Sequence, residues 1–173
     1  MNSWNEARQP LSPPEPDTEK RLRDGTLPAE EDLSTAALRA RLESAGRSHL
    51  PGALDELHAC VLEYFARQLS MRDDPGHLQT TAKNLVWTFW ALADLEPVPT
   101  ETLVELKQML GVELRAAEDG AREILVTHCL EPLFESRRMA AMFADWEEDR
   151  QLRDVYQRAL AWGEGFWPQT RGG

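Results

Sequence analysis

The amino-acid sequence predicts an all-α fold: a single-domain bundle of six or seven mostly antiparallel helices around a buried central helix at about residues 78–95. Three observations predict this class. No segment alternates apolar and polar residues with the period of a strand. Apolar residues recur at helical spacing in successive segments, and the short connections between them favour antiparallel neighbours. From Leu85 to Leu95, only Thr88 and Asp94 are not apolar.

The central helix is expected to be buried because its residues leave almost no polar face. Trp87, Phe89 and Trp90 all fall within the same short apolar run. A membrane span needs about 20 apolar residues, whereas this run is shorter and contains Asp94. Burial within a helical bundle is therefore the better interpretation, and the prolines that follow the run prevent the helix from continuing.

Residues 1–27 are expected to form a disordered leader, because prolines are concentrated there and large apolar residues are few. The spacing of these prolines also fits a polyproline segment that docks on a partner, but that pattern is common by chance. A flexible tail is expected at residues 168–173. Residues 28–167, between the leader and the tail, are predicted to form one helical domain.

The first two helices are expected at about residues 28–44 and 51–70. Pro28 suits the first turn of a helix, and Gly46 is a plausible stop. The second helix carries an apolar stripe at three- and four-residue spacing, formed by Leu54, Leu57, Val61, Phe65 and Leu69.

A further helix is expected to begin near Thr100, after the central one. Thr102 and Glu105 are spaced like a capping box, in which each side chain satisfies a backbone N–H of the first turn. Gly111 lies inside the apolar stripe of this helix, and we expect it to mark a close crossing. Asp119 and Gly120 are expected to end the segment.

The C-terminal third is predicted to contain three more helical segments. The first spans about residues 121–134, where Pro132 should kink or end the helix. The second carries an apolar stripe of Met139, Met142, Phe143 and Trp146. The last is expected at about residues 147–162, with Gly163 as its stop.

The charge balance restricts the partners that this chain is expected to bind. It has 19 basic and 30 acidic residues and a formal net charge of −11. Nucleic-acid binding requires a basic face, and anionic membranes also repel such a protein, so neither is expected. Acidic helix faces fit a protein partner with a basic patch, although simple solvation is the preferred explanation of such faces.

Cysteine usage and the N-terminal residues favour the cytoplasm. Cys60 and Cys129 do not make a disulfide framework in a chain of 173 residues. The first residues show no apolar segment of the kind found in signal peptides. A reducing cytoplasm is therefore the expected location.

No residue pattern selects a catalytic, metal or cofactor site. His58 and Cys60, and likewise His128 and Cys129, are too close in sequence for both members of a pair to face one site from a helix. The zinc, nucleotide-binding and nucleophile-elbow motifs are absent from the sequence. We therefore expect no metal, no cofactor and no catalytic residue, and enzyme activity is left open but not favoured.

The C-terminal aromatic residues and an acidic run are the candidate partner-binding residues. Tryptophan is enriched in interface hot spots, but the same rings packed onto the bundle would act as an anchor. The candidates are Trp162, Phe166, Trp167, Glu147, Glu148 and Asp149.

These observations favour a non-enzymatic protein-binding module as the function. It would be a regulatory or inhibitory partner, comparable to an adaptor, antitoxin or immunity protein, or a small helical subunit of a larger assembly. The alternative is a small-molecule-binding or catalytic bundle with a pocket lined by Trp87 or Trp90. The oligomeric state is left open.

Overall fold

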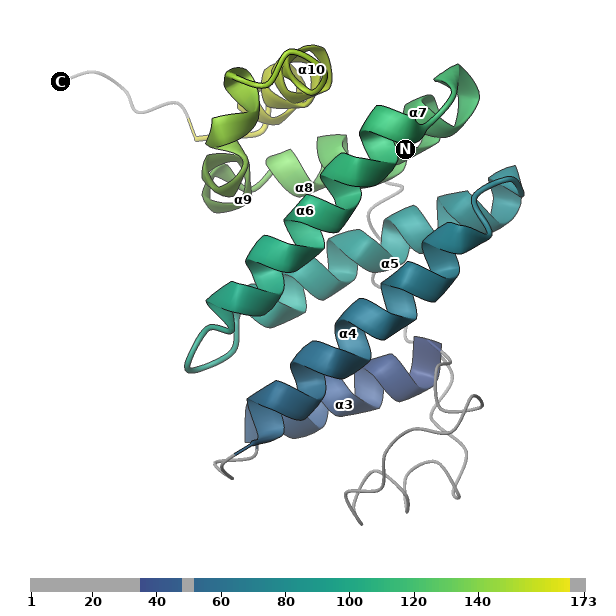
Figure 1. Cartoon of the computed structure of the whole chain (residues 1–173). Helices are drawn as coiled ribbons and strands as arrows, with labels where there is room; N and C mark the ends of the chain where they lie inside the picture. Colours follow the sequence, from purple (N-terminus) through teal and green to yellow (C-terminus); the bar gives the residue numbers. More distant parts are fainter. Residues whose placement is uncertain (1–34, 48–51, 169–173) are drawn as a thin grey trace, which may run out of the picture. The chain divides into compact units, whose positions relative to one another are not determined.

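The all-α class is confirmed by a computed structural model that describes residues 35–47 and 52–168 (Figure 1). No strand occurs within these ranges. The predicted leader, Pro28 at the first helix start and most of the tail lie outside them. The elements are α3 (Thr35–Arg47), α4 (Ala53–Ser70), α5 (Pro75–Ala93), α6 (Thr100–Ala116), α7 (Asp119–Leu125), a π-helical turn (Val126–Leu130), α8 (Glu131–Phe134), α9 (Arg137–Met142), a 3-10 turn (Ala144–Glu147) and α10 (Arg153–Glu164).

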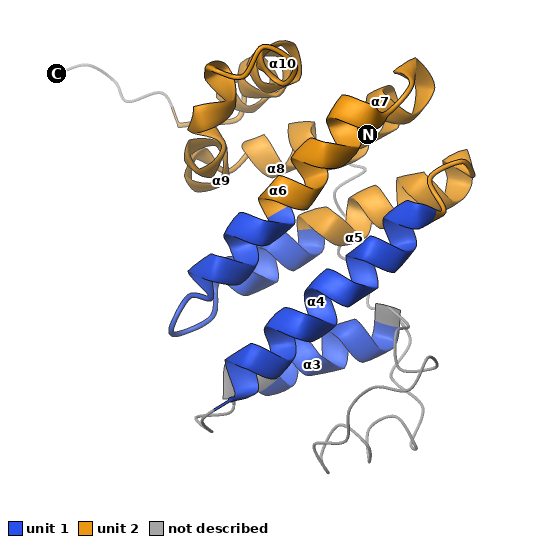
Figure 2. Ribbon diagram, viewed as in Figure 1, with its two compact units in different colours: residues 1–70, 87–106 blue, residues 71–86, 107–173 orange. Residues whose placement is uncertain are grey.

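The chain divides into two compact units (Figure 2). Unit 1 comprises residues 1–70 and 87–106, and unit 2 comprises residues 71–86 and 107–173. Helices α5 and α6 contribute residues to both units. The single helical domain expected over residues 28–167 stays a prediction.

Helix α5 begins earlier than the apolar pattern predicts, at Pro75 instead of Leu78, and it ends at Ala93. The Asp74 side chain explains this start. Its Oδ1 accepts hydrogen bonds from the N–H groups of Gly76 at 3.0 Å and His77 at 3.1 Å. Pro75 supplies a backbone angle suited to the first turn and lacks an N–H that would need a partner. The segment Asp73–Gly76 therefore separates α5 from α4 and also starts α5.

Unit 1 has a core of leucine, valine and aromatic side chains from α3, α4 and the unit 1 parts of α5 and α6. Tyr64 and Phe65 of α4 meet edge to face with ring centres 4.9 Å apart, and Phe89 of α5 is fully buried. The apolar stripe predicted for the second helix is buried at Leu57, Val61, Phe65 and Leu69. Helix α3 runs through Gly46, so that glycine is not the helix stop that the sequence predicts.

Unit 2 is built around an aromatic cluster. The Phe134 ring lies 5.4 Å from the Phe143 ring and 5.6 Å from the Tyr156 ring, measured between ring centres. Phe143 also meets Trp146 edge to face at 4.8 Å. Trp146 packs with Leu152 over Gly111, where an added Cβ would lie 3.4 Å from each side chain. These are ordinary contact distances to side chains of later segments, so the close helix crossing expected at Gly111 stays a prediction.

Pro132 interrupts the regular helix in the way its chemistry requires. It offers no N–H to the carbonyl four residues earlier, at His128, and its ring would collide with that carbonyl in a regular α-helix. A π-helical turn at Val126–Leu130 directly precedes α8, the helix that contains Pro132. Such turns are a recognised cause of helix kinks. The regular α-helix is thus interrupted before Pro132, and the kink itself stays a prediction.

The last helix differs from its prediction at both ends. It begins at Arg153 instead of residue 147, because a 3-10 turn precedes it and Asp149 then shapes a separate turn. The Asp149 Oδ1 accepts the N–H groups of Gln151 at 2.8 Å and Leu152 at 3.3 Å. Local bonds of this kind compete with helix formation. Helix α10 continues through Gly163 to Glu164, so Gly163 is not the helix stop.

Gly163 is buried where α10 lies directly against the end of α8. A Cβ at this position would overlap the Phe134 carbonyl oxygen and lie 2.7 Å from its carbonyl carbon. Backbone atoms cannot rotate away as side chains do. Glycine is therefore required for the observed packing of α10 on α8.

Arg158 links α10 to α7 and α8 through ion pairs with Glu123 and Glu131. Its Nε donates to the Glu131 Oε1 at 2.8 Å, and two further N–H groups donate to Glu123 at 2.6 and 2.8 Å. Glu131 is only 7 % exposed, so a cation is needed beside it. The hydrogen bond from Arg158 also holds the pKa of the exposed Glu123 at about 2.

Two glycine-to-alanine variants test the Gly163 contact. Gly163→Ala should lower the free energy of unfolding by about 3 kcal/mol or more, because the methyl group overpacks a rigid backbone contact. Gly120→Ala in α7 is the matched control, since no atom lies within 4 Å of its added Cβ. The control should gain about 0.4–1 kcal/mol from lost chain entropy in the unfolded state. Urea denaturation measures both, and a Gly163→Ala variant as stable as the natural chain would contradict this packing.

Candidate functional site

The end of α10 presents two large aromatic side chains to solvent. Trp162 is 47 % exposed and Phe166 is 53 % exposed. Their ring centres are 5.7 Å apart, so the two rings form one surface. The inward stripe of α10 contains Val155, Tyr156, Ala159 and Gly163. Trp162 follows Val155 by seven residues and so lies at the edge of that stripe, where it is only partly covered.

Trp167 plays a different part from its two neighbours. It is half-buried, and its indole N–H donates to the Phe134 carbonyl oxygen at 3.0 Å. The guanidinium of Arg137, at the start of α9, lies 5.1 Å from the centre of its ring. The sequence left two roles open for these aromatic residues, an exposed interface or an anchor packed onto the bundle. The structure shows a different environment for Trp167 than for the other two. Trp167 is anchored to the unit, whereas Trp162 and Phe166 are exposed beside it.

We call the surface formed by Trp162 and Phe166 the aromatic patch. Polar groups lie near it. The Trp162 indole N–H donates to Glu135 Oε1 at 3.2 Å, and Arg137 lies over Trp167, the residue after Phe166. An apolar centre with a polar margin is the usual anatomy of a protein-binding surface.

The acidic run contributes less free charge than its sequence suggests. Asp149 forms an ion pair with Arg115 at 2.6 Å, and its pKa is lowered mainly by that hydrogen bond and by the N–H of Gln151. Glu147 accepts a hydrogen bond from the Gln157 side chain at 2.7 Å. Glu148 is exposed. Two of the three carboxylates therefore help to shape the chain before and within α10.

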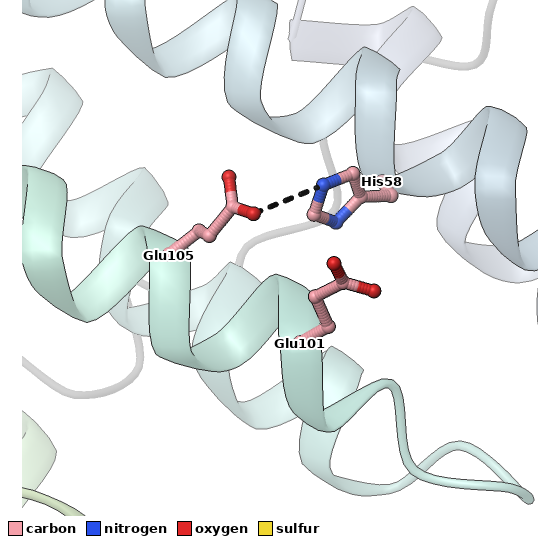
Figure 3. A group of neighbouring side chains, drawn as sticks. All are labelled: His58, Glu101 and Glu105. Carbon is pink, nitrogen blue, oxygen red and sulfur yellow. Dashed lines mark ion pairs between the residues drawn. The ribbon is translucent and has the colours of Figure 1, made fainter.

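A cluster that the sequence analysis did not identify lies in unit 1 (Figure 3). It consists of His58 on α4 and of Glu101 and Glu105, one turn apart on α6. One ligand atom from each side chain lies within 4.8 Å of the other two. In the sequence, His58 lies two residues from Cys60, and Glu105 has the spacing of a capping box with Thr102. The four-residue spacing of the glutamates was a detectable signal, but the histidine belongs to a distant segment.

The predicted capping box is wrong because Thr102 has another partner. Helix α6 begins at Thr100, so Thr102 lies within its first turn and not before it. The Thr102 hydroxyl lies 2.8 Å from His58 Nδ1, and the residue is only 2 % exposed. Thr102 thus fixes the His58 ring, whereas Glu105 faces the other ring nitrogen.

The remaining candidates for chemistry are enclosed. Cys60 and Cys129 are both buried, and burial raises the pKa of the Cys129 thiol. A thiol of that kind is a poor nucleophile at neutral pH. Burial also lowers the pKa of the half-buried His128. In unit 1, the Arg39 guanidinium lies 4.5 Å from the centre of a Trp87 ring, so one face of that indole is covered by a cation.

Comparisons with protein-family models, with curated proteins and with solved structures give no match for this chain. Within the described residues, no helix combines the length and the apolar character needed to cross a membrane.

The Asp149–Arg115 pair predicts a dependence of stability on acidity. The folded pKa of Asp149 lies below its ordinary value of 3.8, so the unfolded chain binds more protons in that interval. The stabilisation is therefore complete above the ordinary value and is lost as the pH falls through the folded pKa. NMR titration of the carboxyl carbon measures the midpoint directly.

Arg115→Gln should raise the Asp149 midpoint, because it removes the largest cause of the shift. Arg72→Gln is the matched control, since Arg72 pairs with Glu113 and not with Asp149. An Asp149 midpoint that is the same in Arg115→Gln and in the natural chain would contradict the role of this ion pair.

Proposed function

We propose that this protein is a non-enzymatic binding module that recognises another protein through the aromatic patch. The observation that carries the proposal is the exposure of Trp162 and Phe166 side by side on a unit that has a complete aromatic core. Exposed apolar patches bordered by polar groups often mark protein-binding sites, and these two rings lie side by side. Tryptophan within such a surface is the residue most often found to dominate binding energy.

The way the aromatic patch is held also supports this proposal. Trp167 is fixed by its hydrogen bond to Phe134, and Trp162 by its bond to Glu135. Rings that are ordered before binding lose little conformational freedom when a partner covers them. The partner is expected to offer an apolar pocket and, beside it, a basic patch that complements the net charge of −11.

The test compares the natural chain with a double variant, Trp162→Ala with Phe166→Ala, in affinity capture from the native cell. A protein captured by the natural chain is then purified and its binding measured by surface plasmon resonance. The double variant should weaken binding at least about tenfold, mainly through faster dissociation, which corresponds to about 1.4 kcal/mol. Val112→Ala is the control, because Val112 is an exposed apolar residue of unit 2 on α6.

Two results would count against this function. The first is equal binding of the same captured protein by the natural chain and the double variant. The second is self-association of the natural chain in sedimentation experiments that disappears in the double variant, since the aromatic patch would then be a contact between copies.

Raising the salt concentration should slow association with a basic partner, because it shortens the Debye length from about 10 Å at 0.1 M to about 3 Å at 1 M.

A further inference from the structure

The His58 cluster in unit 1 has the donor set of a transition-metal site. An imidazole nitrogen and two carboxylates suit zinc and its first-row neighbours. Calcium and magnesium prefer sites made of oxygen ligands alone. The three side chains come from two helices and point toward one another (Figure 3). We propose that His58, Glu101 and Glu105 bind one divalent first-row transition metal ion, with Zn²⁺ as the best-fitting example.

The distances are close to those that a zinc ion requires. His58 Nε2 and Glu105 Oε1 are 3.6 Å apart. Two ligand atoms held about 2.0–2.1 Å from one tetrahedral zinc ion are themselves about 3.3 Å apart. The widest separation within the cluster is no more than 4.8 Å. The exposed glutamate side chains can close that difference by rotating about their own bonds.

The buried Thr102 hydroxyl supplies an independent indication. Histidines that bind metals usually donate their second ring N–H to a fixed protein group, which orients the ring and leaves the other nitrogen as the ligand. Here Thr102 lies 2.8 Å from His58 Nδ1, and Nε2 faces the carboxylate of Glu105. With Nδ1–H donated to the hydroxyl, the lone pair of Nε2 is directed at the Glu105 carboxylate. Thr102 is thus a positioning residue for the metal ligand.

Charge also favours a divalent ion over a simple ion pair. A protonated His58 balances only one of the two carboxylates that surround it. A divalent cation with a neutral imidazole balances both. Three protein ligands leave a fourth zinc position for water or for a ligand atom from outside, as in open zinc sites. Binding would also tie α4 to α6 within unit 1.

Calorimetric titration of the EDTA-treated, dialysed full chain with Zn²⁺ tests this site. We expect one ion per chain and a rise in melting temperature on binding. His58→Gln, Glu101→Gln and Glu105→Gln should each weaken Zn²⁺ binding at least about tenfold, because loss of an outer-shell partner alone already costs about 10–100-fold. Glu63→Gln is the matched control, since Glu63 is an exposed glutamate on the same helix as His58.

Two further measurements locate the ion. Thr102→Val should weaken Zn²⁺ binding at unchanged stoichiometry, and Thr102→Ser should restore it. The Co²⁺-substituted chain should lack thiolate-to-cobalt charge-transfer absorption. That absorption would place the ion on Cys60 or Cys129 and overturn the proposal. No saturable Zn²⁺ binding up to millimolar concentration, or equal affinity in the three cluster variants and the natural chain, would overturn it as well.

Discussion

The carbonyl group of Phe134 is the point on which the arrangement of unit 2 depends. It lies at the C-terminus of α8, where the last carbonyls of a helix have no partner within the helix. The indole N–H of Trp167 supplies that partner at 3.0 Å. Gly163 lies against the same carbonyl because it has no Cβ to exclude it. One backbone group thus contacts both Gly163 in the last turn of α10 and Trp167 beyond the end of that helix. Phe166 lies in the chain between these two contacts, and Trp162 directly precedes the first.

The ion pairs of unit 2 give several of its acidic residues a structural role. Asp149 is compensated by Arg115, and Glu123 and Glu131 share Arg158. These carboxylates hold turns and helices in place, and their arginine partners are already counted in the net charge of −11. Charge therefore acts on the rate of encounter, whereas the aromatic patch supplies contacts that persist in a complex.

The sequence predicted features that depend on neighbouring residues and missed those that depend on distant ones. The leucine and phenylalanine side chains that recur at helical spacing are buried as expected. Pro132 interrupts its helix, and this could be predicted because the missing N–H is a property of the residue itself. Gly163 was predicted to end α10, since a glycine near a helix end usually does. Its actual role comes from α8, and no local pattern reveals that contact. Likewise, Glu101 and Glu105 carry a visible spacing, but their proximity to His58 arises only from folding.

Unit 2 displays Trp162 and Phe166 to solvent, whereas Trp146 lies in its aromatic core. Fluorine NMR of the chain labelled with 5-fluorotryptophan tests this directly, with each signal assigned by a Trp→Phe variant. The resonance of an exposed ring shifts when H₂O is replaced by D₂O, whereas a buried ring is insensitive. We expect a large solvent shift for Trp162 and almost none for Trp146, which is buried against Phe143. A Trp162 signal as insensitive as that of Trp146 would rule out an exposed aromatic patch, because the patch would then be covered by the protein itself.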